Sequence, residues 1–364
     1  YGRFQVSMTY TVLSLFFIPC FKWNKHYYVQ TSCCNMVYEL DAEVGKRIAA
    51  GEDVEILPQH LRRMNQQGYG YSMKRCRNCG FSTTEEARER TKDADVVIVN
   101  KVQINETSIG EAEHLKLVCV TATGTNNLDK AYLDAHGIAW RNVAGYSTET
   151  VAQHTFALLF YLWEKLRYYD DYVKSEKYVG DITFTHFDNV FHDLNGKTWG
   201  IIGLGAIGRR VADIAKMFGC HVIYYSTTGK NNQPGYERVE FDELLAKSDI
   251  VSVHAPLTEQ TEGLMNAEAF SKMKPSAIFL NLGRGPIVVE RDLADALENK
   301  TIAGAGLDVL TVEPMSAENP LKRIKDSDRL IITPHIAWAS LEARTRLMKI
   351  IEGQIRDFFG GSDK

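Results

Sequence analysis

A glycine-rich motif, Gly203-Leu-Gly205-Ala-Ile-Gly208, offers the clearest chemistry in this 364-residue sequence. The apolar run 197–203 precedes the motif and the amphipathic segment 209–218 follows it. In a strand–turn–helix of this kind, the first glycine permits a tight turn and the second lets the backbone approach a pyrophosphate. The third lets the helix pack closely on the sheet, and the helix N-terminus offers N–H groups to the phosphates. The motif therefore predicts a dinucleotide site at Gly203, Gly205, Ala206, Ile207 and Gly208.

The residues beyond the motif bear on which dinucleotide binds. An acidic residue about 20 positions on holds the adenosine ribose of NAD in such domains, but residues 214–236 contain neither Asp nor Glu. The sequence offers Ser226, Thr227 and Lys230 instead, which can donate hydrogen bonds to a 2′-phosphate that a carboxylate would repel. The cofactor is thus NADP or NAD, with NADP favoured. The open alternative is that these residues form an ordinary loop and NAD binds through ribose hydrogen bonds.

Alternating strand and helix patterns surround the motif and would position it. Strand-like runs follow at His221–Ser226, Ile250–Ala255, Ala277–Leu282, Ala303–Val309 and Leu330–Thr333. Helical patterns separate several of them, at Asp242–Lys247, Ala267–Met273 and Arg291–Asn299. With the strand before the motif, these segments predict six parallel strands in a doubly wound dinucleotide-binding domain.

A second group of elements lies upstream. Helical patterns cover Thr83–Lys92 and Glu149–Tyr168, and strand-like runs cover Ala94–Asn100, Leu115–Ala122 and Ile138–Val143. Strands separated by helices favour a second parallel sheet. A closing helix is predicted at Leu341–Phe359, and two more helices are possible at Asp41–Ala50 and Leu57–Gln67.

Several segments together give the chain a family resemblance. They are ATGTNNLD (122–129), GYSTETVAQHTFALL (145–159), GKTWGIIGLGAIGRRVA (196–212), HAPLTEQTEGLMN (254–266), NLGRGPIVVE (281–290), AGLDVLTVEP (305–314) and TPHIAWAS (333–340). From about Ser82 onward the sequence resembles the D-isomer-specific 2-hydroxyacid dehydrogenases, in particular the glycerate dehydrogenase/hydroxypyruvate reductase branch.

The resemblance implies an α/β fold with two Rossmann-like or flavodoxin-like parallel-sheet domains. The cofactor domain, residues 147–334, would be inserted in a discontinuous substrate domain made of residues 1–146 and 335–364, with residues 1–80 unassigned. The active site would lie in the cleft between the two domains. A homodimer is likewise expected from the resemblance.

Three residues carry the implied chemistry. Reduction of a 2-keto acid places negative charge on the carbonyl oxygen, which requires a proton donor and a positive clamp. By resemblance His335 is the general acid in reduction and the general base in oxidation. Glu313 would accept a hydrogen bond from the other ring nitrogen of His335. Arg284 would donate hydrogen bonds from its guanidinium to the substrate carboxylate and carbonyl.

The resemblance also implies residues around the reacting atoms. The substrate would contact Thr123, Gly124, Tyr146 and Trp338. The cofactor pocket would include His254, Pro256, Asn281 and Asp308. Trp338 is expected to narrow the substrate pocket. Each of Arg284, Glu313 and His335 alone could be structural, and it is their combination, each at the end of a predicted strand of the cofactor domain, that favours a site.

The leading functional interpretation is an NAD(P)-dependent oxidoreductase that reversibly reduces a small 2-keto acid, such as hydroxypyruvate or glyoxylate, to the D-2-hydroxy acid. A second interpretation is an NAD(P)-sensing interaction protein, because the family includes transcriptional corepressors of the same fold. A third is an inactive product with an incomplete substrate domain. The intact set of Arg284, Glu313 and His335 favours the enzyme.

The cysteines indicate whether the first 80 residues could bind a metal, and the net charge indicates whether the surface could bind nucleic acid or a membrane. Five of the seven cysteines, Cys20, Cys33, Cys34, Cys76 and Cys79, lie in this segment. Cys76 and Cys79 could supply two zinc ligands, but no second pair has a recognisable spacing, so we expect no metal site. Cys119 and Cys220 fit buried, inert thiols. A net charge of −4 without a long basic run is a poor match to nucleic acid or to an anionic membrane surface. The odd number of cysteines and their uneven placement do not resemble a secreted disulfide framework, which favours a cytoplasmic protein.

Overall fold

The computed structural model describes residues 4–15, 18–31, 37–52, 54, 61–63 and 84–360, and it divides into two units, Tyr1–Met73 and Lys74–Lys364. Within the described residues, no helix combines the length and the apolar character that crossing a bilayer would need.

The first unit contains an antiparallel sheet, which the sequence analysis does not predict. Its four strands are ordered β1-β2-β3-β4, and helix α1 follows β3. The bounds are β1 Phe4–Leu15, β2 Ile18–Thr31, β3 Val37–Leu40, α1 Ala42–Ala49 and β4 Leu61–Arg63. The helix predicted at 41–50 is confirmed, and the Asp41 carboxylate caps it by accepting from the backbone N–H groups of Glu43 and Val44. The helix predicted at 57–67 is wrong at residues 61–63, which pair with β3 as a strand.

The second unit begins with a three-stranded parallel sheet in the order β5-β6-β7. Its elements are α2 Thr84–Thr91, β5 Val96–Val99, α3 Glu106–Ile109, β6 Leu117–Val120, α4 Lys130–Ala135 and β7 Ala139–Asn142. All four residues of the central strand β6 are buried, as expected when both faces of a parallel sheet are covered. The final helix, α11 Leu341–Gly360, contacts β6, and the side chain of Gln354 donates to the carbonyl oxygen of Asn142.

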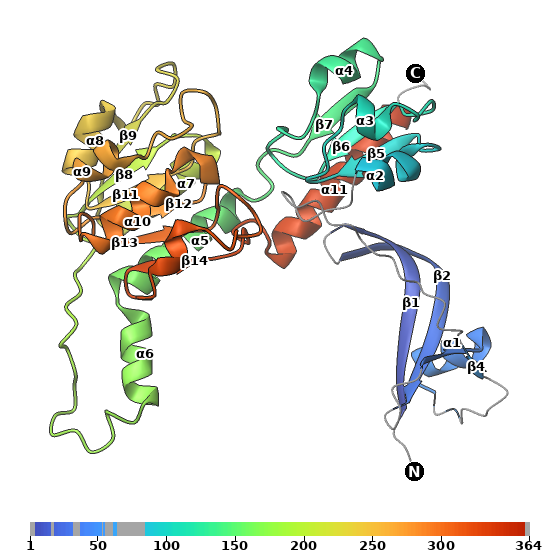
Figure 1. Cartoon of the computed structure of the whole chain (residues 1–364), viewed down its shortest axis with the longest axis horizontal. Coiled ribbons are helices and arrows are strands. Elements are labelled where there is room, and N and C mark those ends of the chain that lie inside the picture. The colour runs from blue at the N-terminus through green and yellow to red at the C-terminus, as the bar shows by residue number, and fades with distance from the viewer. Residues whose placement is uncertain are drawn as a thin grey trace. The chain divides into compact units, whose positions relative to one another are not determined.

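The larger sheet has seven parallel strands in the order β10-β9-β8-β11-β12-β13-β14 (Figure 1). The strands are β8 Thr198–Ile202, β9 His221–Tyr225, β10 Glu237–Arg238, β11 Ile250–Val253, β12 Ile278–Asn281, β13 Gly304–Leu307 and β14 Leu330–Ile332. The six predicted parallel strands are confirmed, and β10 is an additional edge strand of two residues that pairs with β9. A run this short carries no readable alternation of polar and apolar residues, which explains why the sequence does not show it.

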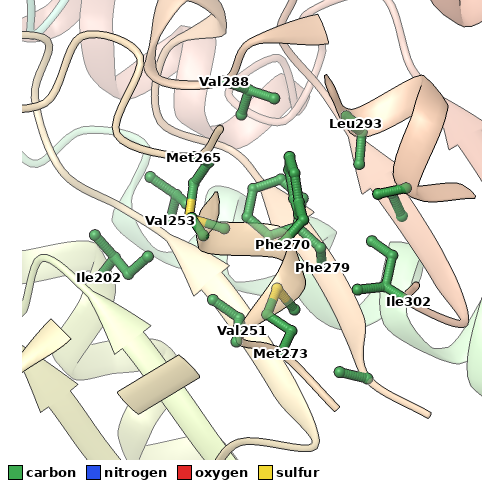
Figure 2. Packing of buried hydrophobic residues seen from close by; sticks show 14 of the residues in the cluster. Ile202, Val251, Val253, Met265, Phe270, Met273, Phe279, Val288, Leu293 and Ile302 are labelled. Carbon is green, nitrogen blue, oxygen red and sulfur yellow. The ribbon is translucent and has the colours of Figure 1, made fainter. Parts of the chain in front are cut away.

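Helices and short 3-10 turns connect these strands. They are α5 Thr148–Trp163, α6 Leu166–Lys174, α7 Ala206–Met217, α8 Phe241–Lys247, α9 Ala267–Ser271, η2 Gly285–Ile287, α10 Glu290–Glu298 and η3 Pro320–Arg323. The sheet separates two apolar clusters. One, shown in Figure 2, gathers buried side chains from the strands and from α8, α9 and α10, among them Val251, Phe270 and Phe279. The other packs α5 and α7 onto the opposite face around Trp199 and Phe156.

The single helix predicted from Glu149 to Tyr168 is wrong, because the chain breaks between α5 and α6. Lys165 adopts a left-handed conformation with φ of 53°, which stops the regular hydrogen-bond ladder. The two halves also differ in environment. Helix α5 buries eight side chains, whereas α6 buries none. An apolar helix packed on the sheet is therefore followed by an amphipathic helix on the surface.

Candidate active site

A cleft of about 390 Å³ collects residues that lie near the carboxyl ends of strands of both parallel sheets. It is lined by Thr123, Gly124, Tyr146, Gly205, Ala206, Ile207, His254, Pro256, Arg284, Asp308, His335 and Trp338, all predicted site residues. The carboxyl ends of parallel strands are the usual location of ligands in such folds. Seven further predicted residues, Gly203, Gly208, Ser226, Thr227, Lys230, Asn281 and Glu313, do not line this cleft.

His335 and Glu313 form the polar pair at the cleft. Nδ1 of His335 lies 2.7 Å from Oε2 of Glu313, which leaves Nε2 as the ring nitrogen that can serve a substrate oxygen. Burial acts to raise the pKa of Glu313, but the hydrogen bond and charge of His335, the backbone N–H of Leu310 and the charge of Lys101 outweigh it. The net result is a pKa below the ordinary value, so the carboxylate is ionised at neutral pH and can stabilise the imidazolium form.

The backbone of His335 is held in an unusual conformation. Its φ is 56°, in the left-handed region that residues other than glycine rarely adopt. The buried Asp308 carboxylate fixes the next residues, because it accepts hydrogen bonds from the backbone N–H groups of Ile336 and Ala337 at 2.8 and 2.9 Å. Thr333 Oγ1 also donates to Asp308 at 2.6 Å, and His154 Nε2 lies 3.0 Å from Thr333 Oγ1. Asp308 thereby orients the segment that carries His335.

Arg284 supplies the fixed positive charge. Its guanidinium lies so close to Gly124 that a Cβ there would come within 2.5 Å of Nη2. The guanidinium and the backbone of the 123–124 loop therefore form one surface, on which a carboxylate can be bound by both. Burial lowers the pKa of Arg284, while the charges of Glu313 and Tyr146 oppose that shift. A guanidinium nevertheless remains charged at neutral pH.

The turn that carries Arg284 is built by Asn281. This buried side chain donates to the carbonyl oxygen of Arg284 at 3.0 Å and accepts from the backbone N–H of Gly283 at 3.0 Å. Asn281 thus acts on the site through the NLGRG turn, and it is not among the residues that line the cleft.

The glycine motif fits a bound dinucleotide. Gly203 has φ of 92° and packs on Ala255, and a Cβ at Gly208 would lie 2.4 Å from the carbonyl oxygen of Gly203. These two glycines therefore permit the turn and the close helix packing that the motif predicts. Gly205, at the N-cap of α7, has open space where a Cβ would be and lines the cleft. Its backbone is accessible to a phosphate, as the motif requires.

His254 forms another part of the cleft wall. Burial lowers its pKa to about 3, so the ring is neutral at physiological pH. Its Nε2 pairs with Ser252 Oγ at 3.1 Å, whereas Nδ1 is buried and has no hydrogen-bond partner in the described part of the chain. A buried orphan nitrogen beside an open cleft fits a site that a bound group completes.

The sequence reasoning missed Lys101, which lines the cleft beside Asn100. Both residues follow directly after β5, and their place at the carboxyl end of a strand of a parallel sheet, where ligands usually bind, is the signal that could have indicated them. The two inert thiols are confirmed: Cys119 and Cys220 are buried and unpaired, and burial raises the pKa of each to about 11. Among the residues that the structure describes, no three His, Cys, Asp or Glu side chains gather as a metal ion would need.

Comparisons with known proteins agree with the cleft chemistry. Residues 156–337 match the model of the D-isomer specific 2-hydroxyacid dehydrogenase NAD-binding domain. A Haemophilus influenzae protein named "Putative 2-hydroxyacid dehydrogenase" is 41% identical over 76% of this chain and 88% of its own length. A hydroxypyruvate reductase of Blautia hydrogenotrophica is 38% identical over 76% of this chain and 86% of its own length.

Solved structures give the same picture. An Aquifex aeolicus D-lactate dehydrogenase complexed with NAD and lactic acid superposes with a TM-score of 0.67 and 28% identity, over 75% of this chain and 85% of that one. An acyclic imino acid reductase in complex with NADPH and D-Arg gives a TM-score of 0.69 and 30% identity, over 88% and 94% of the two chains.

A separate match covers the first unit. Residues 1–89 match the model of a zinc-ribbon family. Cys33, Cys34, Cys76 and Cys79 lie outside the described residues. From the dehydrogenase match and the relatives at 38–41% identity, the chain belongs to the D-isomer specific 2-hydroxyacid dehydrogenases.

Proposed function

We propose that this dehydrogenase reduces a small 2-keto acid of the hydroxypyruvate or glyoxylate type to the D-2-hydroxy acid, reversibly. The observation that carries the proposal is that His335, held by Glu313 behind the cleft wall, lines one cleft with an arginine that lies against the Gly124 backbone. The names of relatives as hydroxypyruvate reductase and glycerate dehydrogenase support this substrate class.

The residues of the chain divide the work. When bound, the nicotinamide dinucleotide supplies or accepts the hydride. Arg284 and the N–H groups of the 123–124 loop hold the carboxylate, so the carbonyl carbon is fixed in place. In reduction, the imidazolium of His335 donates its Nε2 proton to the carbonyl oxygen. In oxidation, the neutral ring takes that proton back, while Glu313 keeps the ring oriented through Nδ1.

The assay that tests the proposal compares NADH and NADPH oxidation with hydroxypyruvate, glyoxylate, pyruvate and phenylpyruvate. We expect turnover with hydroxypyruvate or glyoxylate and a higher kcat/KM for these acids than for phenylpyruvate. Cofactor binding without turnover of any of the four acids would contradict the proposal.

The loop after β9 supports NADPH as the preferred cofactor. Thr228 and Lys230 are exposed there, and Arg238 donates Nη1 to the carbonyl oxygen of Gly229 at 2.9 Å, which brings a second cation to the loop. Ser226 is buried and its hydroxyl accepts from the backbone N–H of Asn231 at 3.2 Å. Ser226 therefore shapes the loop, and the exposed residues are the ones that can reach a 2′-phosphate.

A reversal of cofactor preference tests this loop. Replacing Thr227 by Asp introduces the carboxylate that the segment lacks, which repels a 2′-phosphate and accepts from ribose hydroxyls. We expect Thr227→Asp to lower the kcat/KM ratio of NADPH to NADH by about 10-fold or more. Replacing Lys230 by Met should lower the same ratio to a lesser extent. A wild-type protein that prefers NADH would overturn the cofactor proposal and leave the dehydrogenase intact.

An apolar surface supports a homodimer. We define the arm as residues 166–193, which comprise α6 and the segment after it. The segment folds back on the helix, because the His186 ring stacks on Tyr172 at 3.7 Å and its Nε2 lies 2.8 Å from the Tyr168 hydroxyl. The arm nevertheless exposes Val179, Ile182, Phe184, Phe187 and Val190. An ordered segment that exposes five large apolar side chains is typical of an interface.

Measuring the oligomeric state in solution tests whether the arm forms the dimer interface. We expect light scattering to give the mass of a dimer for the wild type, and the double variant Phe184→Ser/Phe187→Ser to shift the equilibrium to monomer. The matched control Ile350→Ser changes an exposed apolar residue on α11 and should remain dimeric. A monomeric wild type would contradict the homodimer.

A second function concerns residues 1–89. We propose that this segment binds zinc, because it matches a zinc-ribbon family model and contains the C-x-x-C pair Cys76 and Cys79. Thiolates are suitable ligands for structural zinc, and bound zinc would supply folding stability rather than catalysis. Metal analysis of the full chain should give about one zinc per protein, lost in Cys76→Ser/Cys79→Ser. Wild-type protein without zinc would contradict this proposal.

A further inference from the structure

A third cation lines the cleft besides Arg284 and His335. Lys101 follows Asn100 directly after β5, and both residues contribute to the cleft wall. The turn that carries Lys101 is fixed, because the side-chain amide of Asn100 donates to the carbonyl oxygen and to Oγ1 of Thr121 at 2.9 and 3.1 Å. The backbone position of Lys101 is therefore defined, and its ammonium group lies at the end of a flexible four-carbon side chain.

Electrostatics connects Lys101 with the reacting centre. Its charge helps to lower the pKa of Glu313, which is hydrogen-bonded to His335. Among the described residues that line the cleft, Lys101 and Arg284 are the two that keep a positive charge at all physiological pH values. The cleft thus holds two positively charged side chains, Lys101 and Arg284, which lie on different loops.

The proposed chemistry uses only one of these cations. Arg284 lies against the backbone of Gly124, where the substrate carboxylate is held. His335 serves the carbonyl oxygen. The remaining variable part of a small 2-keto acid is its C3 substituent, to which neither Arg284 nor His335 is assigned. Most of the rest of the cleft lining is apolar, as at Tyr146, Trp338, Leu257 and Leu282, or neutral and polar, as at Asn126 and Ser147. Lys101 is the remaining cation.

We propose that Lys101 recognises the C3 substituent of the substrate and so selects 2-keto acids that carry a hydroxyl or a carboxylate on C3. This inference rests on the proposed function and deepens it. An ammonium has three donors and a flexible stem, so it can bind either oxygen group without the fixed fork that an arginine imposes. Acids with hydrogen at C3 gain nothing from Lys101, and acids without a C3 atom cannot reach it.

The experiment compares substrates within each variant. Steady-state kcat/KM is measured for hydroxypyruvate, oxaloacetate, pyruvate and glyoxylate in the wild type, Lys101→Met, Lys101→Arg and the control Lys349→Met. Lys349 is an exposed residue of α11 that does not line the cleft. Pyruvate, which has no polar group at C3, is the internal reference, so each result is a ratio to pyruvate.

In Lys101→Met the hydroxypyruvate-to-pyruvate ratio should fall roughly 10- to 100-fold, the range expected for one hydrogen bond to a charged group. The oxaloacetate-to-pyruvate ratio should fall at least as far, because a full charge pair is lost. Lys101→Arg should recover part of both ratios, and Lys349→Met should keep the wild-type values. The glyoxylate-to-pyruvate ratio should stay within about 2-fold of wild type in all variants.

Two results would overturn the inference. An equal loss of kcat/KM for all four acids, together with a shifted pH profile, would mean that Lys101 acts through Glu313 and does not recognise the C3 substituent. Unchanged ratios in Lys101→Met, with a wild type that reduces the acids, would overturn this inference alone. A wild type that reduces none of the acids would overturn the proposed function and this inference together.

Discussion

The two walls of the cleft are built differently. On the wall from the seven-stranded sheet, side-chain hydrogen bonds fix the reacting groups: Asp308 holds the backbone after His335, Asn281 builds the turn of Arg284, and Glu313 orients the imidazole. On the wall from the three-stranded sheet, the contributions are a loop backbone at 123–124 and the long side chain of Lys101. The difference suggests that chemistry depends on the first wall and substrate choice on the second.

The largest effect that sharpens this comparison is expected at Arg284. Replacement by Leu removes the fixed charge from the wall and leaves the carboxylate without its main partner. We expect kcat/KM to fall roughly 1,000-fold or more for every 2-keto acid, because both substrate binding and the developing oxyanion lose a charged donor. Lys in its place should recover only part, since an ammonium lacks the fork geometry. An effect limited to a higher KM for one acid would contradict this general role and would mean that Arg284 contributes to substrate selectivity.

Asp308 tests whether the first wall acts through the backbone conformation of His335. Asp308→Asn keeps the size of the side chain but replaces one acceptor oxygen by a donor, which cannot pair with the N–H of Ile336 or Ala337. We expect kcat to fall roughly 10- to 100-fold while the Kd of the cofactor changes little. The conservative control Thr333→Ser keeps the hydroxyl that Asp308 accepts and should be nearly normal. An equal loss in kcat and in cofactor affinity would contradict a positioning role.

Asp308 and Ser226 show which parts of the site could be predicted from the sequence and which could not. The strand and helix patterns predicted the larger sheet, and the glycine motif predicted the turn at Gly205, Ala206 and Ile207. The cleft and the other predicted lining residues came from the family resemblance. Neither source could show that Asp308 binds backbone N–H groups or that Ser226 turns inward, because those contacts depend on loop conformations with no periodic pattern. The break at Lys165 was missed because α5 and α6 both have helical composition, and one residue with positive φ separates them.

The first unit was the least predictable region. Strand β1 alternates apolar and polar residues from Phe4 to Val12, a period-two signal of a strand that the sequence analysis did not use, whereas β2 shows no such regular alternation. Adjacent Cys33 and Cys34 do not resemble a usual zinc pair. Residues 1–89 nevertheless match a zinc-ribbon family model, which the spacing of the cysteines did not indicate.

The pH dependence of stability tests the pair on the first wall. The folded-state pKa of Glu313 lies below its ordinary value of 4.5. Ionised Glu313 therefore stabilises the fold above pH 4.5, and this contribution is lost as the pH falls through the lower folded-state pKa. We expect Glu313→Gln to lower the Tm relative to wild type at pH 6, with the difference shrinking towards zero as the solution becomes more acidic than pH 4.5. A constant difference down to pH 3 would contradict an ionised pair.

The smallest expected effect concerns the apolar lining. The Trp338 ring lies edge-on to Tyr146, with centroids 6.5 Å apart and an interplanar angle of 62°. Trp338→Ala removes this bulk, so we expect the kcat/KM ratio of phenylpyruvate to pyruvate to rise about 5- to 10-fold. An unchanged ratio would show that another side chain limits substrate size.

The most direct test of the account is a paired measurement on His335→Ala. Tryptophan fluorescence titration gives the Kd for NADPH and NADH, and a single-turnover experiment with hydroxypyruvate gives the rate of the chemical step. The account predicts cofactor affinity within about 3-fold of wild type and a chemical step at least about 1,000-fold slower, since His335 donates the proton but does not hold the dinucleotide. A His335→Ala variant that binds cofactor normally and still reduces hydroxypyruvate at a near-normal rate would contradict the central claim.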